Sequence, residues 1–216
     1  MIERIDSYRD SRFSQTVLNQ HGAYLISGQA YEVEIVGKYT AVMRGGDPEQ
    51  FRRLAEEFRF HAPHITRFLD EGGAVLFEYA PERELTVALD QIQPSQFYID
   101  ADKLNAVKTF VHSAEDIVIQ VLPWEGRYIS LDGHTRLYLA AQNGYETVHA
   151  VAAETDDWVW TFVREARRRG IYSPKDLFLL PHERYTELWD RYCDEVFARE
   201  AWAQPADLST DKNVEN

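Results

Sequence analysis

The chain has very little cysteine, no long apolar run and a shortage of positive charge. Its single cysteine, Cys193, excludes an intramolecular disulfide framework and fits a reducing compartment. The longest apolar runs fall well short of the ~20 residues that a membrane-spanning helix requires. The first residues mix charges and lack the apolar stretch of a signal peptide. We therefore expect a cytoplasmic protein without a membrane partner.

Positive charge is scarce, because 23 Lys and Arg stand against 36 Asp and Glu and give a formal net charge of -13. Proteins that bind nucleic acid usually neutralise phosphates with clustered Lys and Arg, so this balance disfavours a duplex-DNA partner. One local cluster, Arg164 and residues 167–169, falls within two turns of an expected helix. A solvated helix end that complements the helix dipole explains this cluster better than a binding patch does.

Hydrophobic residues make up 44% of the 216 residues and aromatic residues 13%, which excludes a disordered chain and allows a sizeable core. The patterning predicts an α+β protein that begins with a small α+β lobe over residues 1–80. Asp47 is the expected N-cap of a helix that ends near Phe60. The strands of this lobe are expected at residues 23–27, 31–36, 39–43 and 74–79.

A second domain is expected over residues 85–152, with the element order β-α-β-β-α-β. Asp100 or Asp102 would cap its first helix, and Gly144 fits the left-handed position that ends its second helix. Residues 156–203 follow a purely helical pattern and would form an extension packed on this domain. Three tryptophans would fill the core between this extension and the sheet, namely Trp158, Trp160 and Trp189. Residues 204–216 are polar and are expected to be disordered.

Chemistry is concentrated at the segment Asp132-Gly133-His134-Thr135-Arg136, where a strand turns into a helix. Gly133 allows a sharp turn and a close approach to a ligand, while the first free amides of the helix favour an anion. Arg136 adds a charged donor that can bind two oxygens at once. Asp132 could hold a ribose hydroxyl, orient His134 or bind Mg²⁺ through water, and the charge of His134 can change near neutral pH. The pattern predicts a phosphate-binding turn, although an isolated Asp-Gly pair is more often an ordinary turn.

This strand, turn, helix, glycine, strand arrangement resembles the ParB/sulfiredoxin-like superfamily. ParB-type proteins carry Gly-Glu-Arg-Arg at the turn and sulfiredoxins carry Gly-Cys-His-Arg, where this chain has residues 133–136. The nearest pattern is the Asp-Gly-His-His-Arg of the free-serine-kinase branch, which phosphorylates a small hydroxy amino acid with ATP or ADP. The resemblance covers roughly residues 85–152 and implies a small mixed sheet with flanking helices. It also implies that nucleotide phosphates bind to Gly133, His134, Thr135 and Arg136.

Two departures limit what the resemblance implies. The catalytic cysteine of sulfiredoxins falls at His134, and Cys193 lies far downstream on an expected helix, so cysteine-sulfinate reduction is excluded. The kinase branch has a catalytic glutamate where this chain has Gln96, and an amide cannot take a hydroxyl proton. Either another carboxylate substitutes for it or kinase activity is absent; the candidates are Asp90, Asp100 and Asp102.

The expected function is nucleotide and phosphate binding. Its enzymatic form would be a phosphotransferase that uses ATP or ADP with Mg²⁺ on a small hydroxylated metabolite, with Asp132 and His134 as catalytic residues. Gln96 and Asp100 would lie on the substrate side. The alternative is a module that senses a nucleotide or contacts a protein partner without chemistry, and Gln96 favours it. A DNA-binding ParB-like factor comes last, because the C-terminal helices are acidic and rich in tryptophan.

Two further groups of residues have ordinary explanations. His61 and His64, followed by Asp70 and Glu71, match no strong pattern of metal ligands, so we expect structural or surface roles and no metal site. The N-terminus would form an arm on a second copy of the chain if the protein is a homo-oligomer, which the sequence does not decide. The residues of this arm would be Tyr8, Arg9 and Arg12.

Overall fold

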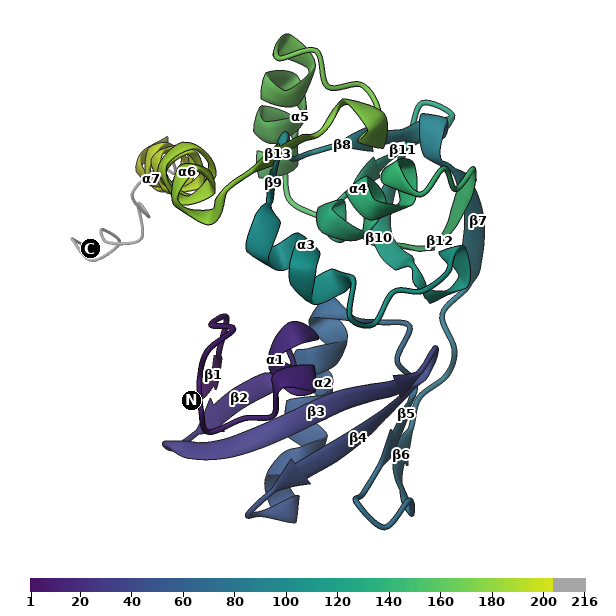
Figure 1. Cartoon of the computed structure of the whole chain (residues 1–216), viewed down its shortest axis with the longest axis vertical. Helices are drawn as coiled ribbons and strands as arrows, with labels where there is room; N and C mark the ends of the chain where they lie inside the picture. Colours follow the sequence, from purple (N-terminus) through teal and green to yellow (C-terminus); the bar gives the residue numbers. More distant parts are fainter. Residues whose placement is uncertain (204–216) are drawn as a thin grey trace, which may run out of the picture.

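Two lobes built on different sheets, followed by a helical segment, make up residues 1–203, which are the residues that the computed structural model describes (Figure 1). The expected tail over residues 204–216 lies outside the described residues. Within residues 1–203, no helix combines the length and the apolar character needed to cross a membrane.

The N-terminal lobe is a six-stranded sheet whose strands follow one another in sequence order. Asp47 accepts a hydrogen bond from the amide of Glu49 at 3.0 Å and so starts the short 3-10 turn that leads into α2. The expected helix and strands are confirmed, whereas β1, β5 and α1 were missed because each has only three to five residues. The elements are β1 (Ile2–Arg4), α1 (Gln15–Asn19), β2 (Ala23–Ile26), β3 (Gln29–Gly37), β4 (Thr40–Gly45), α2 (Phe51–His61), β5 (Arg67–Leu69) and β6 (Val75–Glu78).

Alternation along the strands gives this sheet a core on each face. In β2, Tyr24 and Ile26 join the cluster under α2, while Ala23 and Leu25 pack on the side of α1. This is the pattern of a sheet covered by helices on both faces, because successive strand residues point to opposite sides. The C-terminal end of α2 faces the second lobe, as Figure 1 shows.

The second lobe is a mixed five-stranded sheet in the order β7-β12-β10-β11-β8. β12 runs parallel to β10, and β11 runs parallel to β8, while the other two pairs are antiparallel. The α+β class with a mixed sheet is therefore confirmed. The strands are β7 (Glu84–Ala88), β8 (Ile92–Pro94), β10 (Val118–Trp124), β11 (Arg127–Ser130) and β12 (Thr147–Ala152).

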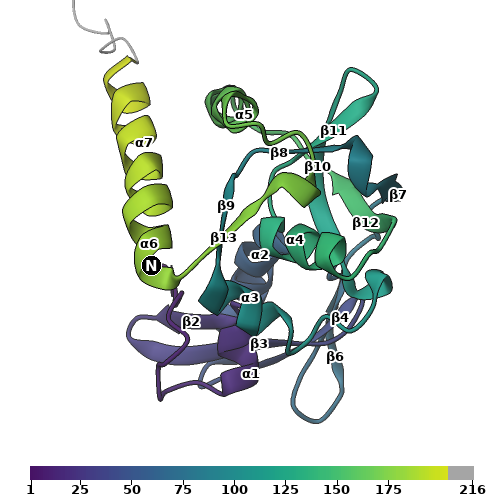
Figure 2. The same cartoon turned by 45° about the horizontal axis from the view of Figure 1, so that its top comes forward.

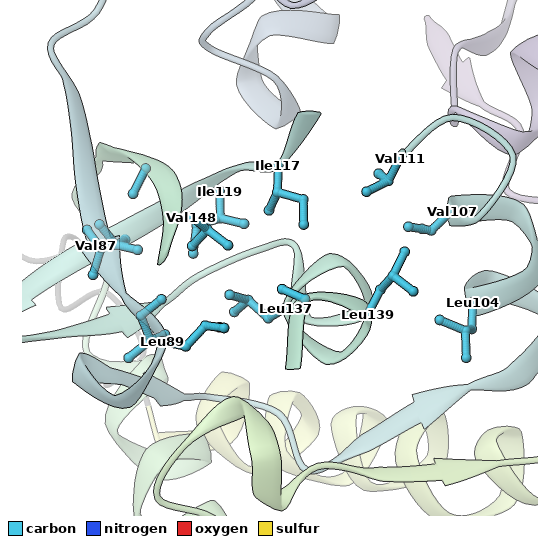
Figure 3. Packing of buried hydrophobic residues seen from close by; sticks show 14 residues of the cluster. Val87, Leu89, Leu104, Val107, Val111, Ile117, Ile119, Leu137, Leu139 and Val148 are labelled. Atoms are coloured by element: carbon cyan, nitrogen blue, oxygen red, sulfur yellow. The ribbon is translucent and has the colours of Figure 1, made fainter. Parts of the chain in front are cut away.

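Helices flank this sheet on both faces. α3 (Ala101–Val107) and α4 (His134–Gln142) cover one face and enclose the apolar core shown in Figure 3. α5 (Trp158–Arg168) packs on the other face against Ile129. Two expected helix ends are confirmed: Asp100 caps α3 by accepting from the amide of Asp102 at 2.8 Å, and Gly144 has a positive φ of 72° after α4.

The C-terminal segment is not purely helical, which corrects the sequence prediction. Strand β13 (Phe178–Leu180) pairs in parallel with β9 (Tyr98–Asp100), and the chain then continues into α6 (His182–Tyr185), a π-helical stretch (Thr186–Asp190) and α7 (Arg191–Ala203), as Figure 2 shows. A three-residue apolar run cannot be assigned from sequence, because its partner strand lies 80 residues away. The tryptophans pack as expected but stay partly exposed, for example Trp189 against Phe97 with ring centres 4.8 Å apart.

Two surface predictions can also be compared with the structure. In the arginine cluster on α5, Arg168 and Arg169 each bond to Glu165 at 2.7 Å, which agrees with a structural role at the end of a helix. The N-terminal residues do not extend away as an arm. The hydroxyl of Tyr8 lies 2.9 Å from Nε2 of His21, and Arg12 pairs with Asp10. Each of these contacts is made within the chain itself.

Candidate functional site

The turn from β11 into α4 depends on glycine at position 133. Gly133 precedes α4 with φ 78° and ψ 19°, in the left-handed region that side chains other than glycine rarely adopt. A Cβ at this position would lie 2.5 Å from Cγ2 of Ile119 and 3.1 Å from Nη2 of Arg136. Both the backbone angle and the lack of space therefore require glycine, so the local geometry expected from the sequence is present.

Arg136 lies at this turn but is already paired. Its Nη2 donates to Oδ2 of Asp132 at 3.1 Å, and its Nη1 donates to the carbonyl of Val118. The Arg136 side chain is 20% exposed and that of Asp132 is 50% exposed. The sequence suggested that the guanidinium of Arg136 is free to bind an anion. In the structure, two of its nitrogens already donate hydrogen bonds within the protein, so fewer donors remain for a ligand.

Asp132 is the first residue of the turn and is ionised at neutral pH. Its surroundings raise the pKa through burial, but the charge of Arg136 and the amide of Gly133 outweigh this, so that the net pKa lies below the usual value. A group of this kind suits a charged role, such as water-mediated contact with a divalent ion. It is a weak base for taking a proton at neutral pH.

His134 is buried and neutral, which corrects the expectation that its charge changes near neutral pH. Burial lowers its pKa to about 4. Its Nε2 lies 3.0 Å from the hydroxyl of Ser130 and accepts from the amide of Ser95 at 3.3 Å, so the ring proton belongs on Nδ1. Ser95 in turn donates its hydroxyl to the carbonyl of Ser130 at 2.7 Å. His134 thus ties α4 to the segment after β8 and has no free Nε2 for catalysis.

A cavity of about 810 Å³ lies between the two lobes, and the turn forms part of its wall. The five residues 132–136 all line it. The amides at 134–136 belong to the first turn of α4, where no preceding carbonyl of the helix can accept their hydrogens. The cavity wall carries charges of both signs: the cations are Arg4, Lys38, Lys103 and Arg136, and the carboxylates are Asp6, Asp116, Asp132 and Asp190. Its apolar wall consists of Ile35, Val36, Phe58, Val107, Phe110 and Val118.

Of the two residues expected on the substrate side, Gln96 lines the cavity and Asp100 does not. Gln96 lines the cavity, and its Nε2 donates to the carbonyl of Tyr98 and, at 3.3 Å, to the hydroxyl of Tyr185. Asp100 does not line the cavity, since it is 1% exposed, caps α3 and bonds to Nδ1 of His182 at 2.8 Å. The prediction that Asp100 caps a helix is therefore confirmed, and its burial gives no support to a role on the substrate side.

The other candidate carboxylates are also displaced from the site. Asp90 and Asp102 are exposed and do not line the cavity. None of the three carboxylates that could have replaced the kinase glutamate is thus on the cavity wall. Within residues 1–203, no group of three or more His, Cys, Asp or Glu side chains is arranged to hold a metal ion.

The N-terminal lobe and the C-terminal segment contribute wall residues that the sequence reasoning did not assign to the site. His61 and His64 line the cavity, although they were expected to be structural or on the surface. Tyr185 also lines it and accepts a hydrogen bond from Nζ of Lys103 at 3.4 Å. In the sequence, only the short spacing of His61 and His64 pointed to a site. The other wall residues could not be predicted, because which residues face the cavity depends on how the two lobes pack against each other.

Comparisons with known proteins add little. No family model matches this chain, and no curated protein matches it. Among solved structures, the chain is similar to protein Atu1540 from Agrobacterium tumefaciens, with 17% identity and a TM-score of 0.32. The similarity covers 44% of this chain and 61% of that protein. A likeness of this degree carries no argument about fold or function.

Proposed function

We propose that the protein binds a phosphate-bearing ligand of nucleotide size in the cavity between its lobes. The observation that carries this proposal is the placement of the turn at residues 132–136 on the wall of a cavity of about 810 Å³. Helix N-termini bind phosphate because their free amides and the helix dipole favour negative charge. The resemblance of this turn to the ParB/sulfiredoxin-like superfamily supports the same ligand class.

The size and lining of the cavity favour a ligand larger than inorganic phosphate. Cavities of about 300–1,000 Å³ commonly hold small organic ligands, with apolar walls and a few polar groups that fix orientation. Here an apolar wall that includes Phe58 and Phe110 adjoins the polar turn. ATP or ADP with Mg²⁺ combines the required anion with a planar base, and Asp132 could contact the metal through water.

A non-catalytic binding module is the form of this function that the geometry supports best. Phosphoryl transfer to an alcohol needs a group that accepts the hydroxyl proton or orients the alcohol. Gln96 is an amide, His134 is buried with its Nε2 engaged, and the pKa of Asp132 is lowered. A phosphotransferase acting on a small hydroxylated metabolite remains the second candidate, because Asp132 is ionised beside the turn.

Thermal-shift titration with ATP, ADP and CTP, each with and without Mg²⁺, tests the binding proposal. At least one nucleotide is expected to raise the melting temperature of the wild type in a concentration-dependent way. Arg136→Ala should lose most of this rise, because it removes a cation from the cavity wall. Arg53→Ala is the matched control, since Arg53 is exposed on α2 and does not line the cavity.

The outcome of the titration separates the candidates. If no nucleotide changes the melting temperature of the wild type, the proposed function is wrong. If a nucleotide binds, a phosphate-transfer assay on serine and similar alcohols follows. Transfer above the rate without protein would establish the phosphotransferase, whereas binding without transfer would establish the binding module.

A further inference from the structure

The histidine loop, by which we mean the last residue of α2 and the loop that follows it, places His61 and His64 on the wall that the N-terminal lobe contributes to the cavity. We propose that both imidazoles bind the phosphate-bearing ligand, so that the N-terminal lobe supplies the second half of the binding site. This inference rests on the proposed function, because it assigns further ligand-binding residues to the same cavity.

The loop is held rigidly by its own lobe. The amide of Ala62 donates to the carbonyl of Phe58 at 3.0 Å and closes the last turn of α2. Arg59 then reaches over the loop, donating from Nε to the carbonyl of Ile65 at 3.1 Å. Its guanidinium also lies 4.2 Å from the ring centre of Tyr79. The two histidines therefore sit on a fixed segment, as a binding site requires.

The same loop is bonded to the strand beside the phosphate-binding turn. Nε2 of Gln120, on β10, donates to the carbonyls of Phe60 and His61 at 3.0 and 3.2 Å. The carbonyl of Gln120 accepts from the amide of Leu131 at 2.9 Å, which directly precedes Asp132. One residue of the second lobe thus links the histidine loop to the start of the turn.

Both rings also interact electrostatically with residues of the turn, which lines the same cavity. Burial, followed by the positive charge of Arg136, lowers the pKa of His64 to about 3, and Asp132 also acts on this ring. Burial lowers the pKa of His61 as well, and its ring likewise interacts with Asp132. Both imidazoles are therefore neutral at neutral pH, and each has one N–H donor and one acceptor nitrogen.

Neither ring is satisfied by the protein. Within residues 1–203, the imidazoles of His61 and His64 make no hydrogen bond or ion pair. His134 in the same cavity shows what a structural histidine does, because its Nε2 has Ser95 and Ser130 as partners. Both side chains are half-buried on the cavity wall, so their ring nitrogens are available to bond a ligand that lies in the cavity.

Isothermal titration with ADP and Mg²⁺ tests this inference on the full chain. His61→Ala and His64→Ala should each weaken binding by about tenfold, the effect of losing one hydrogen bond to a charged group. His64→Asn should recover part of the loss, since its amide can also donate. Glu56→Ala is the control on α2, because Glu56 is exposed and does not line the cavity, and binding to this variant should stay within about twofold of wild type.

Imidazole ¹H–¹⁵N spectra of the wild type give a readout that does not depend on the stability of any variant. The ring signals of His61 and His64 should shift when ADP and Mg²⁺ are added, while those of His182, outside the cavity, should not. If Arg136→Ala weakens binding but both histidine variants and both ring signals are unaffected, this inference is wrong and the proposed function stands. If the wild type binds no nucleotide, both are wrong.

Discussion

The two lobes pair their strands in different ways. In the N-terminal lobe, sheet order equals sequence order, so the main contacts join segments that are close along the chain. In the second lobe, β7 pairs with β12 about 60 residues later, and β8 pairs with β11. Strand order in the N-terminal sheet thus follows the sequence, whereas strand order in the second sheet depends on distant pairing, and the turn at residues 132–136 belongs to this second lobe.

The largest expected effects come from one glycine in each lobe. A Cβ on Gly22 would overlap the backbone carbonyl of Val33, which cannot move away as a side chain can. A Cβ on Gly133 would meet Ile119 at 2.5 Å and would also force alanine into a left-handed conformation. We expect Gly22→Ala and Gly133→Ala each to lower the free energy of unfolding by about 3 kcal/mol or more, measured by urea denaturation.

Gly144→Ala is the control for the second lobe. Gly144 has φ 72° but no atom within 4 Å of an added Cβ, so alanine there incurs only backbone strain of about 1–2 kcal/mol. Hydrogen exchange would show which lobe loses protection in each variant. A Gly133→Ala protein as stable as Gly144→Ala would contradict the close packing of the turn on β10.

Local signals explain what the sequence predicted. The capping carboxylates Asp47 and Asp100, the left-handed Gly144 and the strand-to-helix turn at Gly133 each depend on neighbours within a few residues. Alternation of apolar residues was enough to place the longer strands of both sheets to within a few residues, whereas the three-residue strands β1, β5 and β8 were missed. These features could be read because the physical cause of each lies in a short segment.

Long-range contacts explain what the sequence did not predict. β13 is defined by its pairing with β9, and the pairing of Arg136 with the carbonyl of Val118 depends on how α4 lies on β10. The position of His64 in the cavity depends on how two lobes meet. Asp100 was assigned both as a cap and as a substrate residue, and only its buried bond to His182 decides between them.

Each lobe contains one histidine, His64 or His134, whose lowered pKa should make the stability of the protein depend on pH. His64 in the N-terminal lobe has a pKa of about 3 and His134 in the second lobe about 4, both lowered from 6.5 mainly by burial. As the pH falls, the unfolded chain takes up protons at these histidines at a higher pH than the folded chain does. The free energy of unfolding is therefore highest above about pH 6.5 and decreases as the pH falls toward the folded-state pKa values. Each histidine should lower the unfolding free energy by about 2 kcal/mol between pH 7 and pH 5.

His64→Gln and His134→Gln remove the titrating group from one lobe at a time. Urea denaturation at pH 7 and pH 5 should show a smaller difference between the two pH values for each variant than for wild type. A variant whose stability changes with pH in parallel with the wild type would show that the ring in that lobe is already exposed to solvent in the native state.

The smallest expected effect concerns the contact between the lobes. Gln120→Ala removes two hydrogen bonds from β10 to the end of α2 and should lower the unfolding free energy by about 1 kcal/mol. Thermal unfolding followed separately by tryptophan fluorescence and by far-UV circular dichroism should then show whether the lobes still unfold together. Full retention of stability would mean that the histidine loop is held by its own lobe alone.

Backbone NMR of the full chain during titration with ATP and Mg²⁺ tests the central claim most directly. The account predicts that the amide signals of residues 132–136 in the second lobe and 61–64 in the N-terminal lobe shift together, with one saturation curve. The absence of shifts, or shifts confined to a surface away from the cavity, such as the groove between α5 and α7, would contradict it.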